Sequence, residues 1–207
     1  MPESVKAAKR CIDSMPEFNV QMFQAVTPAD NPRKLMEERR IDYSWFTRVD
    51  AGKFSRMHRC MSAFMSHLQL WERCVHDNVE YQIFEHDAVR VGNLPMHIQH
   101  RGTITLGAPS YGAFLTPKHF GAQRLMHKTY FGGAHAYRIK PKAARSILQT
   151  ARSYAMATDV FLNKDLFPWL EEYYPWPVIA KDDFTTIQNE GGCFAKHNYN
   201  KGSYDII

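Results

Sequence analysis

The fold follows from the stretch Tyr81-Gln82-Ile83-Phe84-Glu85-His86-Asp87-Ala88. Its first half, with two aromatic residues and an isoleucine, is typical of a short buried strand. Glu85, His86 and Asp87 follow directly, and a buried strand cannot keep two carboxylates and an imidazole inside without partners. We therefore expect this acidic segment, residues 85–87, at the carboxyl end of the strand, where open α/β sheets place their ligands.

The two carboxylates of the acidic segment suggest a site for a divalent cation. Glu85 and Asp87 are one residue apart, and on a strand such residues point to the same face. A hard cation can bridge two carboxylates to a diphosphate. The alternative is a strand end whose charges only meet solvent, and three residues do not decide between the two.

Length and composition limit the class of protein. A chain of 207 residues predicts one domain that is long enough to bury a core. The apolar content of 44% and aromatic content of 13% indicate a globular chain. No apolar run approaches the roughly 18 residues that span a bilayer, and no secretory signal is visible. The four cysteines form no C-x-x-C pair, so we expect reduced thiols in a bacterial or virus-infected cytoplasm.

The net charge of +5 is unevenly distributed. From Ala88 to Thr158 the sequence contains no Asp or Glu, and this acid-free block suggests an anionic partner on one face. The alternative is a cluster of solvated surface charges. The ten cations of the block are Arg90, Arg101, Lys118, Arg124, Lys128, Arg138, Lys140, Lys142, Arg145 and Arg152.

Hydrophobic periodicity predicts alternating helices and strands. The clearest helix runs from about Arg56 to Val79, because apolar residues recur there at three- and four-residue steps. Asp42 to Phe54 is expected to be a loop or active-site flap. The other expected helices are residues 2–15, 33–40 and from 141 onward, and the expected strands are 18–26, 81–84, 103–106 and 134–139.

Several short motifs in a fixed order resemble those of glycosyltransferase family 25, which includes lipooligosaccharide and collagen galactosyltransferases. Each motif is short, but the shared order is fairly specific. The matching segments are residues 64–71, 83–88, 105–107, 133–137 with 141–144, 159–161, and 174–175 through 185–188.

The resemblance implies an α/β fold, a GT-A-like Rossmann-type three-layer sandwich over residues 1–188, with a C-terminal tail over 189–207. It also implies transfer of a sugar from a UDP-sugar or other nucleotide-sugar to a hydroxyl group, with inversion at the anomeric carbon. The family normally opens with a strand that holds the nucleotide base. Here the first helix is expected to begin at Pro2, so that strand has no counterpart, and either the chain is truncated upstream or the nucleotide base is held differently.

The resemblance also implies roles for particular residues. Glu85 and Asp87 carry over to the family's acidic triplet, which binds the metal and the donor diphosphate. His86 stands where many members have a second acid, which favours Mn²⁺ over Mg²⁺. Asp159 is the expected general base, which would deprotonate the acceptor hydroxyl. The alternative role for Asp159 is a helix cap.

Four histidine and tyrosine positions complete the expected site. His135 and Tyr137 match a family motif that lines the donor site, and His197 is a further candidate metal ligand. His67 lies beside the apolar stripe of the long helix, where a buried structural histidine is the ordinary interpretation and a catalytic one the alternative.

The acid-free block directs the choice of acceptor. We expect Lys118, Arg124 and Lys128 to bind an anionic polymer. A hydroxylated base in DNA is narrowly favoured, because cations without acids suit a phosphate backbone and no basic amphipathic membrane helix is evident. The alternatives are the core of a lipopolysaccharide and, in a different class, a non-catalytic nucleic-acid-binding relative.

Overall fold

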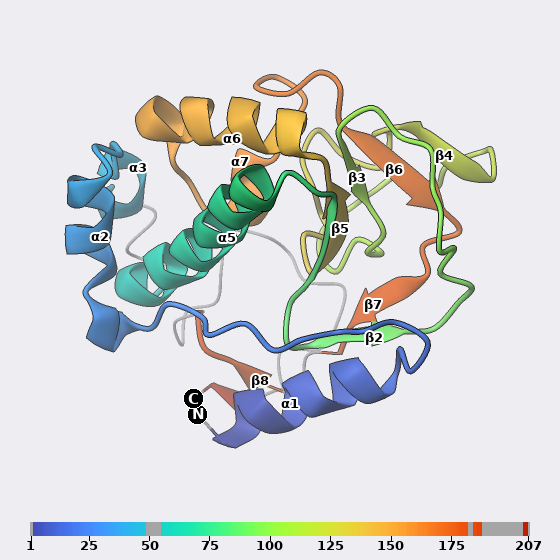
Figure 1. The fold of residues 1–207 in the computed structure, drawn as a ribbon, viewed down its shortest axis with the longest axis horizontal. Helices are drawn as coiled ribbons and strands as arrows, with labels where there is room; N and C mark the ends of the chain where they lie inside the picture. Colours follow the sequence, from blue (N-terminus) through green and yellow to red (C-terminus); the bar gives the residue numbers. More distant parts are fainter. Residues whose placement is uncertain (1, 49–54, 182–183, 188–204, 207) are drawn as a thin grey trace.

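A five-stranded mixed sheet forms the centre of the protein (Figure 1). The computed structural model describes residues 2–48, 55–181, 184–187 and 205–206. The strand order is β1-β5-β3-β6-β4, in which β3 and β6 are parallel and the other neighbours are antiparallel. The strands are β1 (Tyr81–Phe84), β3 (Thr103–Thr105), β4 (Gly121–Arg124), β5 (Ala136–Ile139) and β6 (Glu171–Tyr174).

Two smaller sheets are formed by other described segments. β2 (Ala88–Arg90) pairs antiparallel with β7 (Val178–Ala180). β8 (Phe184–Thr185) pairs in parallel with β9 (Asp205–Ile206), although residues 188–204 between them lie outside the described part of the chain. The expected boundary between a domain and a tail near residue 188 therefore stays a prediction.

The central sheet separates two hydrophobic cores. Successive side chains of a strand point to opposite faces, and on β5 Tyr137 belongs to the larger core whereas Ala136 belongs to the smaller one. The larger core lies under α5 (Met57–Asp77) and α6 (Pro141–Tyr154). The smaller core includes Cys11 of α1 (Pro2–Asp13) and Val178 of β7. Helical layers on either side of a sheet confirm the expected α/β sandwich.

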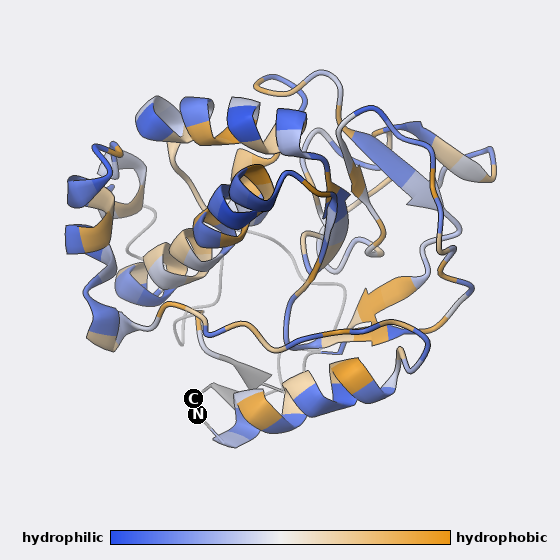
Figure 2. Ribbon diagram, viewed as in Figure 1, coloured by the Kyte–Doolittle hydropathy of each residue, from blue (hydrophilic) through white to orange (hydrophobic). Residues whose placement is uncertain are grey.

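The helices form where the apolar stripes predicted them. α5 buries Met61, Phe64 and Trp71 completely, and it ends at Asn78, which adopts the left-handed conformation common at helix ends (φ 54°). Figure 2 shows α6 with its polar residues turned away from the core and its apolar ones turned inward. The remaining helices are η1 (Pro28–Asp30), α2 (Pro32–Glu38), α3 (Ser44–Thr47) and α7 (Thr158–Phe161).

The strand predicted over residues 18–26 is wrong. This segment is extended but pairs with no described strand. Its end is fixed to α5, because the Val26 N–H donates to Ser66 Oγ at 2.9 Å. The Val26 N–H thus has a side-chain acceptor on a helix in place of a neighbouring strand. The alternating polarity of this segment therefore reflects contact of one of its sides with the protein, not pairing in a sheet. The segment expected as a loop near residue 45 contains α3, and residues 49–54 lie outside the described chain.

Two glycines allow the end of β3 to touch the segment that leads into β5. A Cβ atom on Gly133 would lie 2.2 Å from the carbonyl oxygen of Gly107, and one on Gly107 would lie 2.6 Å from Nε2 of His135. Both distances are shorter than real Cβ contacts. The close approach places His135 beside the acidic segment and requires glycine at both positions.

Replacing Gly133 with alanine should therefore destabilise the fold by about 1–3 kcal/mol, the usual cost of overpacking. Thermal unfolding would show this as a decrease of about 3 °C in Tm for each kcal/mol. Gly92→Ala is the matched control, because its added Cβ would lie 3.4 Å from its nearest neighbour, which is ordinary contact. Equal melting temperatures for the two variants would contradict the close-packing argument.

Within the described residues, no helix combines the length and apolar character needed to cross a membrane.

Candidate active site

The acidic segment forms a turn between β1 and β2. The Ala88 N–H donates to the Glu85 carbonyl at 3.1 Å, and the Glu85 N–H donates to the His135 carbonyl at 2.8 Å. The acidic segment therefore lies at the carboxyl end of β1, as expected, but in a turn, so the strand geometry from which a shared face was inferred does not apply. Glu85 interacts with His67 of α5, whereas Asp87 is close enough to Cys11 of α1 for its charge to raise the pKa of that thiol, which burial already raises, to about 11.

A chain of hydrogen bonds leads from the core to Glu85. The Trp71 Nε1–H donates to the Tyr137 hydroxyl at 2.8 Å, and this hydroxyl lies 2.8 Å from His67 Nδ1. His67 Nε2 lies 3.0 Å from Glu85 Oε1. Because an indole N–H can only donate and a carboxylate can only accept, the chain runs from Trp71 through Tyr137 and His67 to Glu85, and the His67 Nε2–H donates to the carboxylate.

This hydrogen-bonded chain fixes both the position and the charge of Glu85. Burial acts to raise its pKa, but the hydrogen bond from His67 and the nearby His67, His135 and His86 outweigh it and hold the pKa below its usual value. Glu85 is therefore ionised at neutral pH. Its side chain is 36% exposed, so it can still be reached from solvent.

Asp159 lies on α7, beside an aromatic residue from a distant loop. The Tyr111 hydroxyl donates to Asp159 Oδ2, and the Val160 N–H donates to Asp159 Oδ1 at 2.9 Å. Burial raises the pKa of Asp159 above its usual value and the charge of Glu85 adds to this, while the two hydrogen bonds partly oppose it. The carboxyl is therefore a stronger proton acceptor than an exposed aspartate, as a general base requires.

Lys128 connects Tyr111 to a neighbouring loop. Its ammonium donates to the Tyr111 carbonyl and lies 4.9 Å from the centre of the Tyr111 ring and 5.4 Å from that of Tyr130. The two tyrosine rings are stacked, with centres 6.2 Å apart. Burial lowers the pKa of Lys128, and the charge of Asp159 partly restores it. A cation predicted to contact the acceptor is thus beside the candidate base.

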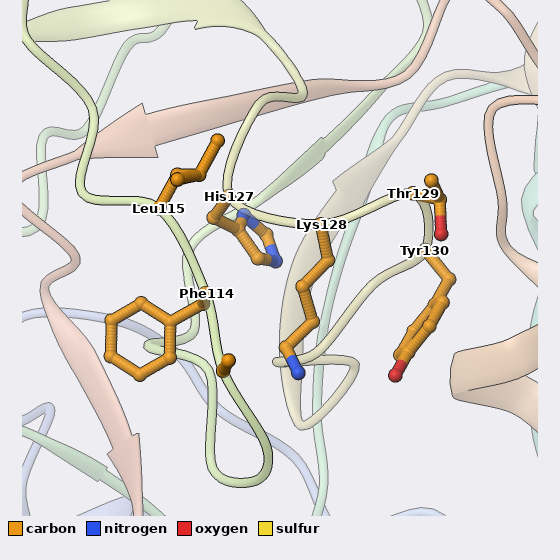
Figure 3. A pocket seen from close by; sticks show the side chains of 7 residues that line it. Phe114, Leu115, His127, Lys128, Thr129 and Tyr130 are labelled. Carbon is orange, nitrogen blue, oxygen red and sulfur yellow. The ribbon is translucent and has the colours of Figure 1, made fainter.

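A cleft of about 330 Å³ opens next to Lys128. One side is formed by residues 113–115 and the other by residues 127–130 (Figure 3). In Figure 3 Lys128 and Tyr130 extend in the same direction from one segment, while Phe114 and Leu115 are on the other. The backbone links the cleft to the segment that follows α7, because the Lys164 N–H donates to the Thr129 carbonyl at 2.7 Å.

The structure places the remaining predicted site residues in several environments. His135 is buried near Glu85, and Tyr137 is completely buried, so Tyr137 supports the site from the core through His67. Arg124 stands next to Glu171 in the strand register. Its side chain is therefore on the face of the sheet that Glu172 does not occupy. Lys118 is exposed, and His197 lies outside the described residues.

The residues present fit a divalent cation only together with further ligands. No group of three His, Cys, Asp or Glu side chains is gathered as a metal site in the described part of the chain. Mg²⁺ and Mn²⁺ sites in phosphate-transferring enzymes commonly use one or two carboxylates plus substrate phosphates. Glu85 is ionised and reachable, and Asp87 follows in the same turn, so these two residues could supply that share.

A comparison with protein families identifies the segment that carries this turn. The family model described as glycosyltransferase family 25 (LPS biosynthesis protein) matches residues 6–100. This segment, a little under half of the chain, is similar to glycosyltransferase family 25. A search of curated proteins finds no match to the chain. The resemblance seen in the motifs is confirmed over this segment, which includes His67, Glu85 and Asp87.

The second half of the candidate site comes from outside the family 25 match. Asp159 and Lys128 were predicted from the sequence, whereas Tyr111 was not. Tyr111 lies in a loop with no periodic pattern, and only the fold brings it to α7. The hydrogen-bonding role of Trp71 was also missed, because its place in the apolar stripe identified it as a core residue only. The similarity to glycosyltransferase family 25 supports a glycosyltransferase, an enzyme class that uses a nucleotide-sugar donor and an acceptor.

Proposed function

We propose that the protein transfers a sugar from a nucleotide-diphosphate donor to a hydroxyl group of an acceptor saccharide, with inversion at the anomeric carbon. The observation that carries this proposal is a pair of carboxyl groups whose pKa values are shifted in opposite directions. Glu85 is held ionised by its histidine neighbours, and Asp159 has a raised pKa and interacts with the charge of Glu85. Pairs of titratable groups with separated pKa values are typical of acid–base sites.

Each carboxylate has a distinct role in the proposed reaction. Asp159 accepts the proton of the acceptor hydroxyl as that oxygen forms a bond to the anomeric carbon. The bond from the anomeric carbon to the diphosphate oxygen breaks, and the nucleoside diphosphate leaves with the electron pair. Glu85 and Asp87 would hold Mn²⁺ or Mg²⁺, which supplies positive charge to the leaving diphosphate when bound.

The positions of the cations favour a saccharide over DNA as acceptor. A DNA-binding face requires the acid-free block to present its charges together, but its members are divided. Arg138 is buried, where it donates to Gln82 and to the carbonyls of Pro95 and Met96. Arg90 pairs with Glu17. Three other cations are on α6, in the helical layer over the larger core.

The proposal is tested by a donor and acceptor screen read by mass spectrometry. UDP-, GDP- and CDP-sugars are incubated with a lipopolysaccharide core oligosaccharide or with hydroxymethylated duplex DNA. We expect one sugar to be added to the oligosaccharide together with release of the nucleoside diphosphate. Addition to DNA alone would move the acceptor assignment to a hydroxylated base. If the protein neither transfers a sugar nor hydrolyses any of the donors, the result would support the non-catalytic alternative.

A further inference from the structure

The two sides of the cleft beside Lys128 differ in chemistry. Residues 127–130 contribute the polar side chains of Lys128, Thr129 and Tyr130 to the lining, whereas residues 113–115 contribute Ala113, Phe114 and Leu115. Phe114 is 39% exposed and Leu115 is 66% exposed. The sides are joined directly, because the Leu115 N–H donates to the His127 carbonyl at 3.0 Å. One small cleft therefore offers both an apolar surface and polar hydrogen-bonding groups.

A run of aromatic rings continues from the apolar side of this cleft. Phe114 meets Trp176 edge-on with ring centres 5.7 Å apart, and Trp176 meets Tyr174 at 5.1 Å. Tyr174 in turn stacks nearly parallel with Phe120, at 6.0 Å and an interplanar angle of 5°. The Phe120 side of this pair is open to solvent, since Phe120 is 82% exposed. Exposed apolar side chains at both ends of the run make it a candidate binding surface.

The base of the cleft is held in place by a buried hydrogen bond between His127 and Glu172. His127 Nδ1 lies 2.8 Å from Glu172 Oε2, and both side chains are completely buried. Glu172 Oε1 accepts the N–H groups of Met126 and His127, and the Gly132 N–H lies 3.3 Å from His127 Nε2. The His127 ring also meets Trp176 edge-on at 5.8 Å. A site held in one shape loses little conformational entropy on binding.

We propose that this cleft and its aromatic run form the acceptor subsite and bind a pyranose ring of an oligosaccharide. A pyranose has a face of C–H bonds, which stacks on aromatic rings, and an edge of hydroxyls, which need polar partners. The cleft supplies both. Its volume of about 330 Å³ is at the lower end of the range for small-molecule sites. Lys128 and Tyr111 connect it to Asp159, so a bound sugar would lie beside the base. This inference rests on the proposed function.

Two other classes of ligand fit the same surface less well. A fatty acyl chain would leave the Lys128 ammonium and the Thr129 hydroxyl without matching groups. A single-stranded nucleic acid stacks on aromatic rings but also needs a cationic groove along its backbone. Lys128 is the cation that lines this cleft, and the sheet register turns Arg124 toward the opposite face from Glu172.

The inference is tested by binding without any donor. The full-length chain is applied to immobilised bacterial and mammalian oligosaccharides, to immobilised oligothymidylate and to phosphatidylcholine–phosphatidylglycerol vesicles. We expect binding to a subset of the oligosaccharides. Phe114→Ala should weaken it about tenfold, since loss of an aromatic contact costs on the order of one such factor. Phe120→Ala should also weaken oligosaccharide binding. It should not affect folding, because the lost ring is almost fully exposed.

The matched control is Tyr154→Ala, because Tyr154 is an aromatic residue on α6 with 54% exposure. This variant should bind like the wild type. Binding to oligosaccharides that is equal in all three variants would overturn the location of the subsite. Binding only to oligothymidylate or to vesicles would overturn the ligand class, and no binding to any probe would overturn the inference as a whole.

Donor hydrolysis separates this inference from the proposed function. Phe114→Ala should retain the wild-type rate of donor hydrolysis while it loses saccharide affinity. Saccharide binding that depends on Phe114, in a protein that neither hydrolyses nor transfers any donor sugar, would keep the subsite and reject the enzyme. If the protein turns over a donor but its saccharide binding does not depend on Phe114, the enzyme would be kept and the location of the subsite rejected.

Discussion

Asp159→Asn should lower the turnover of sugar transfer by about 10²–10⁴, the usual contribution of a general base. The amide is nearly the same size and can still accept the hydrogen bond of the Tyr111 hydroxyl, but it cannot take a proton from the acceptor. Donor affinity should change little, because the expected diphosphate ligands are in the turn after β1. Steady-state kinetics over donor and acceptor concentrations separate the two effects. Turnover within about threefold of the wild type would assign the base elsewhere.

The pH dependence of the wild type offers an independent check on Asp159. A base works only when deprotonated, so the rate should fall as the pH falls through the raised pKa of this carboxyl. The Tyr111 hydroxyl lowers that pKa by stabilising the carboxylate. Tyr111→Phe should therefore raise the pKa further and move the acid limb of the rate profile to higher pH. A limb that is unchanged or moves to lower pH would contradict the role of Asp159.

The sequence predicted those parts of the fold that depend on local periodicity. The stripe that includes Met61, Phe64 and Trp71 identified α5, because a helix must place residues three and four apart on one face. The same argument identified α6. Strands were harder to predict, since their stability depends on partners far away in the sequence. The segment 18–26 alternates in polarity but pairs with no strand among the described residues.

Strand β6 shows why part of the sheet could not be predicted. It contains Glu171 and Glu172, both buried, whereas carboxylates normally indicate surface. The fold satisfies them with distant donors, the Arg101 N–H for Glu171 and His127 for Glu172. No local pattern reports such partners, and the aromatic run that continues from this strand was missed for the same reason.

The candidate site was predictable to the extent that its residues have unusual chemistry for their surroundings. Glu85 and Asp159 stood out as acids next to apolar segments and in family motifs. Their supporting groups did not, because Tyr111 and Trp71 are ordinary aromatic residues until the fold gives their polar atoms a partner. The number of cations in the acid-free block overstated the charge available to an anionic ligand, since Arg138 is buried and donates to Gln82 inside the protein.

Removal of the proposed cation ligands should have an effect as large as loss of the base. Asp87→Asn or Glu85→Gln should abolish most sugar transfer while leaving the thermal unfolding transition close to that of the wild type. Excess chelator should inactivate the wild type, and Mn²⁺ should restore it. Asp77→Asn, a change of an exposed carboxylate at the end of α5, is the matched control and should retain full activity.

Binding of Mn²⁺ measured by electron paramagnetic resonance gives a readout that does not depend on turnover. In the presence of a nucleoside diphosphate, the wild type should bind the ion and Glu85→Gln should not. His67→Phe should fall between them, with affinity about 10–100-fold below wild type, because partners that orient a metal ligand contribute this much. His67 donates to Glu85 Oε1 at 3.0 Å, and its loss leaves the ligand present but unoriented. Full transfer by Asp87→Asn, or undiminished turnover in excess chelator, would reject the cation and leave Glu85 with an electrostatic role only.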